Sequence, residues 1–414
     1  MQQVGMGINT EYILIIICGM VILSYLFSIV SRYILVPSVL LLLFTGILCR
    51  EIFDSYAIII RFPELLIETL GIVGLIMIVL EAGLDLRLGR DKTAIIRNSF
   101  FSALVTLVVS AAVITLILRY WLHEPVDRCL VYAIPLSIMS SSIVIPSIHH
   151  LTRQKKEFLI YEASFSDILG ILFFNYFSAQ ETLTAKSVGL FAGNIIISVL
   201  LSLLISFLLF VILARTRLNI KFFLIFALLV LIYVAGKLLH LPSLLIILAF
   251  GLMINNWDKI RINTLQKILP KEKVDAILHL MHSITAETSF LVRTFFFFLF
   301  GFSISLAFFK ESEIWLVGSL IVIALFIIRF LYLRFFLKTN VVPETFFIPR
   351  GLITIVLFYK IPDHLRLTNF NEGILFFIIL ATSIIMTLGM IFYRKKPGEV
   401  ITEPQFSERS DLLS

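Results

Sequence analysis

The chain has 414 residues, of which 59% are hydrophobic and only 15% charged, and its mean hydropathy is +1.03. A soluble protein needs more polar surface than this, so the composition predicts an all-α polytopic membrane protein. The net charge of +7 is better explained by the loop positions of the basic residues than by an anionic partner. Cys18, Cys49 and Cys129 lie in or beside apolar runs without paired spacing, so we expect them to be packing residues.

Apolar runs of about 20 residues predict thirteen membrane-spanning helices. Their expected ranges are 11–31, 34–50, 65–85, 97–119, 129–149, 158–178, 188–214, 219–237, 241–256, 285–308, 313–337, 343–361 and 372–393. The N-terminus lacks a basic, cleavable leader pattern, so we expect the first helix to be retained. The polar residues 397–414 are predicted to form a short disordered tail.

The basic residues predict the orientation of these helices. Most of the 34 Lys and Arg residues fall in alternate loops or helix ends, one group being Arg329, Arg334 and Lys338. By the positive-inside rule, this predicts a plasma-membrane protein whose N-terminus lies outside the cell and whose C-terminus lies in the cytoplasm. Arg293 and Arg350 are the basic residues expected inside helices.

An internal repeat predicts the domain organisation. The segment VPSVLLLLFTGIL (36–48) matches LPSLLIILAFGLM (241–253) at Pro, Ser, two Leu and Gly. The first segment is expected to run outward and the second inward, which is typical of two inverted-topology repeats in a transporter. We expect a first helix (1–33), a first repeat (34–214, helices 2–7), a second repeat (215–396, helices 8–13) and the tail (397–414). Helices 4–6 and 11–13 would form a core bundle, and helices 1–3 and 7–10 an interface bundle.

Two acidic residues, Glu162 and Asp167, lie in the sixth helix. A charge at the bilayer centre costs about 2.5–3.5 kcal/mol, so an acid there indicates function. Asp167 is about 15 Å into the helix, at the midplane. Ser164 shares its face and Ser166 is adjacent to it. A carboxylate with hydroxyl oxygens suits a dehydrated monovalent cation, so we predict that these three residues bind the ion or proton.

Glu162 points about 140° away from Asp167 on the same helix, so it needs a partner of its own. Arg350, near the middle of the twelfth helix, is the candidate for this structural or coupling pair. An Arg–Glu pair can form two parallel hydrogen bonds, which makes two buried charges tolerable.

Two helices carry interruptions that are predicted to break them. They comprise Ser140, Ser141, Ser142 and Pro146 in the fifth helix, and Pro349, Arg350 and Gly351 in the twelfth. The repeat offset of about 205 carries 140–142 to 345–347, so the breaks fall at equivalent places. Crossed half-helices around a midplane ion site have this arrangement, which adds Ser140 and Ser141 to the candidate ligands.

Two further charged residues are candidates for the ion pathway. Glu81, toward the inner end of the third helix, is an ion ligand, part of an inner funnel, or the partner of a cytoplasmic base. Arg293 is expected to neutralise Glu81, Glu162 or Glu287. No cofactor or fixed metal is expected. The closely spaced histidines lie at a helix end or in a basic loop, namely His149, His150, His279 and His282.

The run from Glu162 to Asp167 stands in register with the E-S-x-x-N-D run of the monovalent cation/proton antiporter superfamily. From about Tyr33 to Tyr393 the chain resembles its NhaP-like sodium/proton antiporter branch. The resemblance implies an NhaA-like antiporter fold, a homodimer, and exchange of Na⁺, or of K⁺ or Li⁺, for protons by alternating access. It assigns ion binding to Asp167 and pairs Glu162 with Arg350.

The same resemblance matches Glu81 to an acid before A/G-G-L, and Arg293 to an arginine before a Phe-rich run. The chain departs from the family at Ala163, at Ser166 and at Met139–Ser141, where T-D-P is expected. One carboxylate is thereby lost, so the ion selectivity does not transfer. A single midplane acid resembles the electroneutral branch.

Other classes of membrane protein make different demands on the sequence. A sodium-coupled solute symporter of similar fold is the alternative, and it requires a roomier pocket with hydrogen-bond donors. A channel requires repeated filter loops, which are absent. A sensor requires an attached signalling domain, and an intramembrane enzyme a motif such as H-E-x-x-H or G-x-S-x-G. Neither is present. The expected partners are the cation, protons and the lipid bilayer, without nucleic acid.

Overall fold

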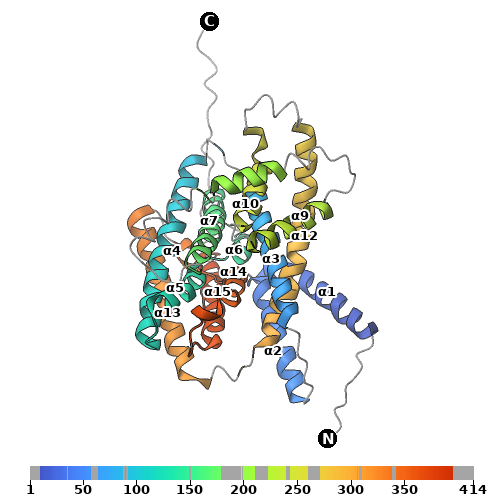
Figure 1. The fold of residues 1–414 in the computed structure, drawn as a ribbon. Helices are drawn as coiled ribbons and strands as arrows, with labels where there is room; N and C mark the ends of the chain where they lie inside the picture. Colours follow the sequence, from blue (N-terminus) through green and yellow to red (C-terminus); the bar gives the residue numbers. More distant parts are fainter. Residues whose placement is uncertain are drawn as a thin grey trace.

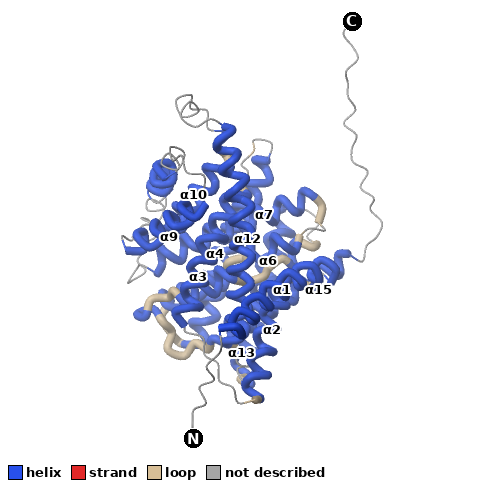
Figure 2. The backbone as a smooth tube through the Cα atoms, turned by 90° about the vertical axis from the view of Figure 1, so that its right-hand side faces the viewer, coloured by secondary structure: helices blue, strands red, loops and turns tan. Residues whose placement is uncertain are grey.

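The computed structural model describes residues 10–34, 36–56, 64–86, 89, 92–148, 151–178, 197, 199–209, 222–238, 243–259, 271–304, 306, 310–337 and 342–394. Within these ranges the chain is helical without strands (Figures 1 and 2). The α-helices are α1 (Thr10–Ile34), α2 (Ser38–Ser55), α3 (Glu64–Asp85), α4 (Thr93–Leu122), α5 (Val126–Ser137), α6 (Ser141–Ser147), α7 (Arg153–Ser178), α9 (Phe222–Leu238), α10 (Ser243–Asn255), α12 (Lys271–Ser303), α13 (Ser312–Tyr332), α14 (Leu352–Tyr359) and α15 (Glu372–Arg394).

The prediction of an all-helical membrane protein is confirmed. Five described segments are long and apolar enough to cross a membrane, namely Thr93–Leu122, Val126–Ser147, Ile277–Ser303, Ser312–Phe336 and Glu372–Tyr393. Hydroxyl side chains within the helices bond back to carbonyls one turn earlier, as Thr106 does to Ser102. Most of the predicted helix 188–214, the tail 397–414 and His149–His150 lie outside the described residues.

The helices pack in two groups (Figure 1). α4 packs against α5, α7 and α13, and α13 packs against α15. We call these helices, together with α6, α14 and the segments flanking α14, the α4 group. α12 packs against α2 and α3, and α3 packs against α10. These helices, with α1 and α9, form the α12 group. The groups meet where α14 lies on α3 and where α10 contacts α7.

Glycines allow unusually close approach of helices within the α12 group. A Cβ atom added to Gly83 of α3 would lie 2.8 Å from the Leu248 carbonyl oxygen of α10, and one added to Gly251 would lie 3.0 Å from Gly83 Cα. Gly46 of α2 and Gly301 of α12 likewise face each other's helix backbone. A larger residue at either contact would separate the helices.

Polar contacts mark two opposite ends of the helices. At the end that we call the Glu157 end, Lys92 pairs with Glu157 at 3.0 Å and Lys155 with Glu344 at 2.8 Å. At the other end, which we call the Glu124 end, Thr368 donates to Glu124 at 2.9 Å. There Trp121 donates to Glu313 at 2.5 Å and Arg50 to the Ser303 carbonyl at 3.0 Å.

The chain leaves helical geometry at both predicted interruptions. α5 ends at Ser137, Ile138 and Ser140 are extended, and α6 begins at Ser141. In the second, a short 3₁₀ turn (Glu344–Phe346) leads into a non-helical segment, and α14 begins at Leu352. The backbone N–H of Ser140 donates to the carbonyl of Pro349 at 2.9 Å, which joins the two interruptions.

Candidate ion-binding site

Asp167 lies in the middle of α7, 3% exposed, where the two helix groups meet. It lines a small cavity, with room for about one water molecule, whose other walls come from α7, α3 and α10. These walls are apolar: Ile78, Val79, Ala82, Ile168, Ile171, Leu172, Leu244, Leu245 and Leu248. Neither carboxylate oxygen of Asp167 has a hydrogen-bond partner among the described residues. Leaving a buried carboxylate without partners is costly, so a purely structural role does not explain why Asp167 is there.

The predicted serine ligands differ in the contacts that their hydroxyls make. The Ser164 hydroxyl is buried and has no hydrogen-bond partner among the described residues. The Ser141 hydroxyl and backbone N–H approach the carboxylate without completing a hydrogen bond. The hydroxyls of Ser140 and Ser142 bond each other at 2.8 Å. Ser166 accepts a hydrogen bond from the Met139 N–H at 2.9 Å, so it also anchors the first interruption to α7.

The second interruption is anchored in the same manner. The backbone N–H of Arg350 donates to the Thr382 hydroxyl of α15 at 3.2 Å, as that of Met139 does to Ser166 of α7. Gly351 is also required here, because a Cβ at this position would overlap the Ser140 hydroxyl.

The predicted pair of Glu162 and Arg350 is wrong. The Arg350 guanidinium is buried, and it donates to the backbone carbonyls of Leu136 at 2.8 Å, Ser137 at 3.2 Å and Ile348 at 2.7 Å. Helix ends leave carbonyls without intrahelical partners, and these lie at the end of α5 and beside the second interruption. Arg350 therefore satisfies carbonyls that the broken helices leave without partners. Pairing its guanidinium with a carboxylate instead would leave these carbonyls unsatisfied.

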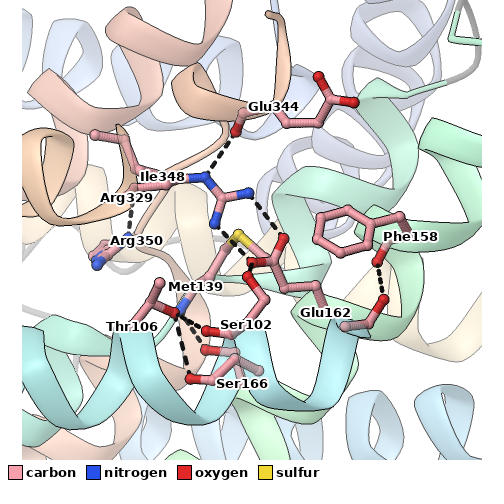
Figure 3. Close-up of polar contacts among 12 residues, drawn as sticks. Ser102, Thr106, Met139, Phe158, Glu162, Ser166, Arg329, Glu344, Ile348 and Arg350 are labelled. Carbon is pink, nitrogen blue, oxygen red and sulfur yellow. Dashed lines mark hydrogen bonds and ion pairs between the residues drawn. The ribbon is translucent and has the colours of Figure 1, made fainter. Parts of the chain in front are cut away.

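The partner of Glu162 is Arg329 of α13 (Figure 3). Arg329 Nη1 and Nη2 donate to Glu162 Oε1 and Oε2 at 2.9 and 2.8 Å. Arg329 Nε donates to the Glu344 carbonyl at 2.7 Å, and Ser102 of α4 donates to Glu162 Oε1 at 2.5 Å. Glu162 is fully buried and Arg329 is 4% exposed, so both charges are paired away from water.

Sequence reasoning missed Arg329 because it was counted with the basic residues of a cytoplasmic helix end. The signal that identifies it is its setting, since Arg329 has apolar residues on both sides whereas Arg334 and Lys338 lie nearer the end of the run. An arginine within an apolar helix is expected to face a partner in the protein interior. Ser102 carries no such signal, because serines are common on the packed faces of membrane helices.

Glu81 and Arg293 pair with each other across α3 and α12, with an Arg293 Nη2–Glu81 Oε1 distance of 3.5 Å. One turn further along α3, Asp85 contacts His282 of α12 at 2.8 Å. Glu287, the other carboxylate considered for Arg293, instead accepts a hydrogen bond from Tyr25 at 2.7 Å. Glu81 is not among the residues that line the Asp167 cavity, although its neighbour Ala82 is.

A helical fold with long apolar spans, interrupted helices and a buried ion pair within the bundle defines an all-helical, multi-pass membrane protein. Residues 19–394 match the family described as sodium/hydrogen exchanger, transmembrane. Because the match covers most of the chain, the protein belongs to the sodium/hydrogen exchanger family. It is a cation/proton antiporter with Na⁺ and H⁺ as transported ions, and a transporter rather than an enzyme.

Solved structures show the same fold. The sodium proton antiporter MjNhaP1 from Methanocaldococcus jannaschii at pH 8 superimposes with a TM-score of 0.65 and 17% identity, over 91% of this chain and 97% of the other. An electron-microscopy map of the same antiporter gives a TM-score of 0.61 and 18% identity, over 93% and 95%. No curated protein matches the sequence. The prediction of an NhaP-like antiporter is therefore confirmed at the level of family and fold.

Proposed function

We propose that Asp167 is the single group that carries either a proton or a dehydrated monovalent cation across the membrane. The observation that carries this proposal is a buried carboxylate whose two oxygens have no partner in the described part of the chain, facing a cavity between two helix groups. Protonated, the side chain is neutral and tolerates its apolar surroundings. Deprotonated, it requires a cation, because a bare charge in such a site is costly. One site that holds either species, but not both, couples their movements.

Ser164 and Ser141 are the further oxygen ligands that the contacts favour. The Ser164 hydroxyl is buried without a hydrogen-bond partner among the described residues, and the Ser141 hydroxyl approaches the Asp167 carboxylate. Ser166 and Ser140 contribute by fixing the first interruption, and each retains a lone pair for an ion. Glu81 belongs to the approach rather than to the ion's first contacts, since it is paired with Arg293 and does not line the Asp167 cavity.

Movement of the α4 group against the α12 group would supply alternating access. The groups correspond to the expected core and interface bundles. An inverted-repeat relation between the two halves of the chain is supported by the packing. α2 lies on α12 and α10 lies on α3, both through glycine contacts, as a pseudo-two-fold relation would require. The two anchors, Met139 to Ser166 and Arg350 to Thr382, form a second related pair.

We further propose that the Glu157 end is cytoplasmic and the Glu124 end faces outward in a plasma membrane. The basic residues support this orientation, since Lys92, Arg153 and Lys155 gather at the Glu157 end. A homodimer through α1 is implied by the family resemblance. Several large apolar side chains of α1 are exposed and available for such a contact, namely Ile15, Ile22, Leu26 and Ile29.

Proteoliposomes with an internal pH dye test this function. Pulses of Na⁺, K⁺ and Li⁺ at equal ionic strength should each be followed for proton movement, with choline as the control cation. We expect Na⁺ to move protons in the wild type, and the Asp167→Asn variant to move none while remaining folded. Wild-type exchange in that variant would refute the assignment of Asp167. The ranking of the three cations gives the selectivity that the altered motif leaves open.

A further inference from the structure

Lys360 and Tyr233 form a contact between the two helix groups. Lys360 directly follows α14 in the α4 group, and its ammonium donates a hydrogen bond to the hydroxyl of Tyr233 in α9 of the α12 group. The same ammonium lies 4.6 Å from the centre of the Tyr233 ring. Tyr233 is buried and Lys360 is partly buried. A lysine held against a tyrosine ring out of water is attracted to both the ring face and the hydroxyl.

This contact differs in kind from the other polar contacts of the protein described above. Each of those hydrogen bonds and ion pairs joins residues of the same group. Other described contacts between the two groups are apolar, as where Val356 of α14 packs on Gly71 of α3 and Leu352 packs on Gly74. Apolar surfaces slide with little loss of energy, whereas a hydrogen bond holds one geometry.

The contact is also linked to the ion site through one short, rigid element. α14 begins directly after Arg350 and Gly351, which touch the first interruption beside Asp167, and ends directly before Lys360. Its eight residues span about 12 Å, so movement of the interruption carries Lys360 with it. Lys360 lies at the Glu124 end, because Phe358 packs on Tyr132, whose hydroxyl accepts the N–H of Leu367 near Thr368.

We propose that the Lys360–Tyr233 contact is a strut that holds the Glu124 end of the Asp167 cavity closed, and that it must break before this end opens. The proposal rests on the alternating movement of the two groups proposed above. It assigns a conformational role to two residues that lie away from the ion site and carry no ion themselves.

Accessibility of the cavity to a membrane-impermeant maleimide tests the strut. Leu245→Cys places a thiol in the cavity wall of α10, after Cys18, Cys49 and Cys129 have been replaced by serine. Asp363→Cys, whose native side chain is 91% exposed, reports in a parallel sample which membrane side holds the Glu124 end. Labelling rates are measured in sealed vesicles from that side.

Lys360→Met should raise the labelling rate of the Leu245→Cys thiol roughly three- to tenfold, the range expected for loss of a partly buried cation–π and hydrogen-bond contact. Tyr233→Phe keeps the ring and removes the hydroxyl, so it should give a smaller increase and still fold. The double variant should match Lys360→Met alone. Lys310→Met, which removes an exposed lysine at the same end, should change nothing.

Unchanged labelling in both single variants would overturn the strut, as would additive effects in the double variant or an equal increase in Lys310→Met. Labelling does not depend on ion exchange, so these outcomes are separate from a failure of the proposed function. If Asp167→Asn retained exchange, the proposed function of Asp167 would be refuted, but the labelling rates would still test the strut.

Discussion

Arg329 holds Glu162 by two parallel hydrogen bonds of 2.9 and 2.8 Å inside the α4 group. Breaking a buried ion pair from one side costs about 3–5 kcal/mol, because it leaves an uncompensated charge. Arg329→Met should therefore lower the melting temperature strongly in detergent, and Glu162→Gln should do so as well. The double variant should lose less than the sum of the two. The exposed Arg334→Met is the matched control, and singles as stable as this control would contradict the pairing.

Arg350 should be sensitive to the shape of its side chain as well as to its charge. Its guanidinium donates to three carbonyls in different directions, which a lysine ammonium cannot reproduce. Each buried carbonyl left unsatisfied costs about 1–3 kcal/mol. Arg350→Lys should thus lower both the melting temperature and the exchange rate, although the positive charge is kept. Wild-type stability in Arg350→Lys would show that charge alone matters at this position.

The contact of α3 with α10 should tolerate no side chain at Gly83. An added Cβ would lie 2.8 Å from the Leu248 carbonyl oxygen, so Gly83→Ala forces apart two helices that line the Asp167 cavity. We expect a lower melting temperature and reduced exchange. Gly19→Ala in α1 is the control, since its added Cβ meets nothing within 4 Å and alanine favours the helix. Equal behaviour of the two variants would exclude the close approach as a determinant.

Glu124 gives the loops at the Glu124 end a pH dependence. Hydrogen bonds from Thr368 hold the pKa of the Glu124 carboxyl below its usual value. Because the pKa is lower in the folded state, the stabilisation is fully present above the unfolded pKa of about 4.3 and is lost as the pH falls through the folded pKa. The melting-temperature difference between wild type and Glu124→Gln should therefore be largest near neutrality and shrink in acid. A melting-temperature difference that grows in acid would contradict a lowered pKa of Glu124 in the folded state.

The sequence predicts the fold well because its signals are local. Long apolar runs define helices. The three serines and the one proline of 140–146, and the Pro349–Gly351 run, mark the interruptions without reference to any distant residue. The partner of Glu162 was predicted wrongly because Arg329 was counted with the basic residues of a helix end, and its pairing depends on how α7 faces α13. Arg350 binds backbone carbonyls, which have no signature in the sequence. The strut between Lys360 and Tyr233 likewise joins positions that no motif relates.

The proposed exclusion of a proton by a cation at Asp167 has a direct measurement. Purified protein in weakly buffered detergent solution is mixed with NaCl, and the protons released are recorded with a pH dye against choline chloride. The wild type should release protons as Na⁺ displaces them, with less release at higher starting pH, where fewer sites hold one. Asp167→Asn, matched to the wild type in melting temperature, should release none. Undiminished proton release from that variant would contradict the account.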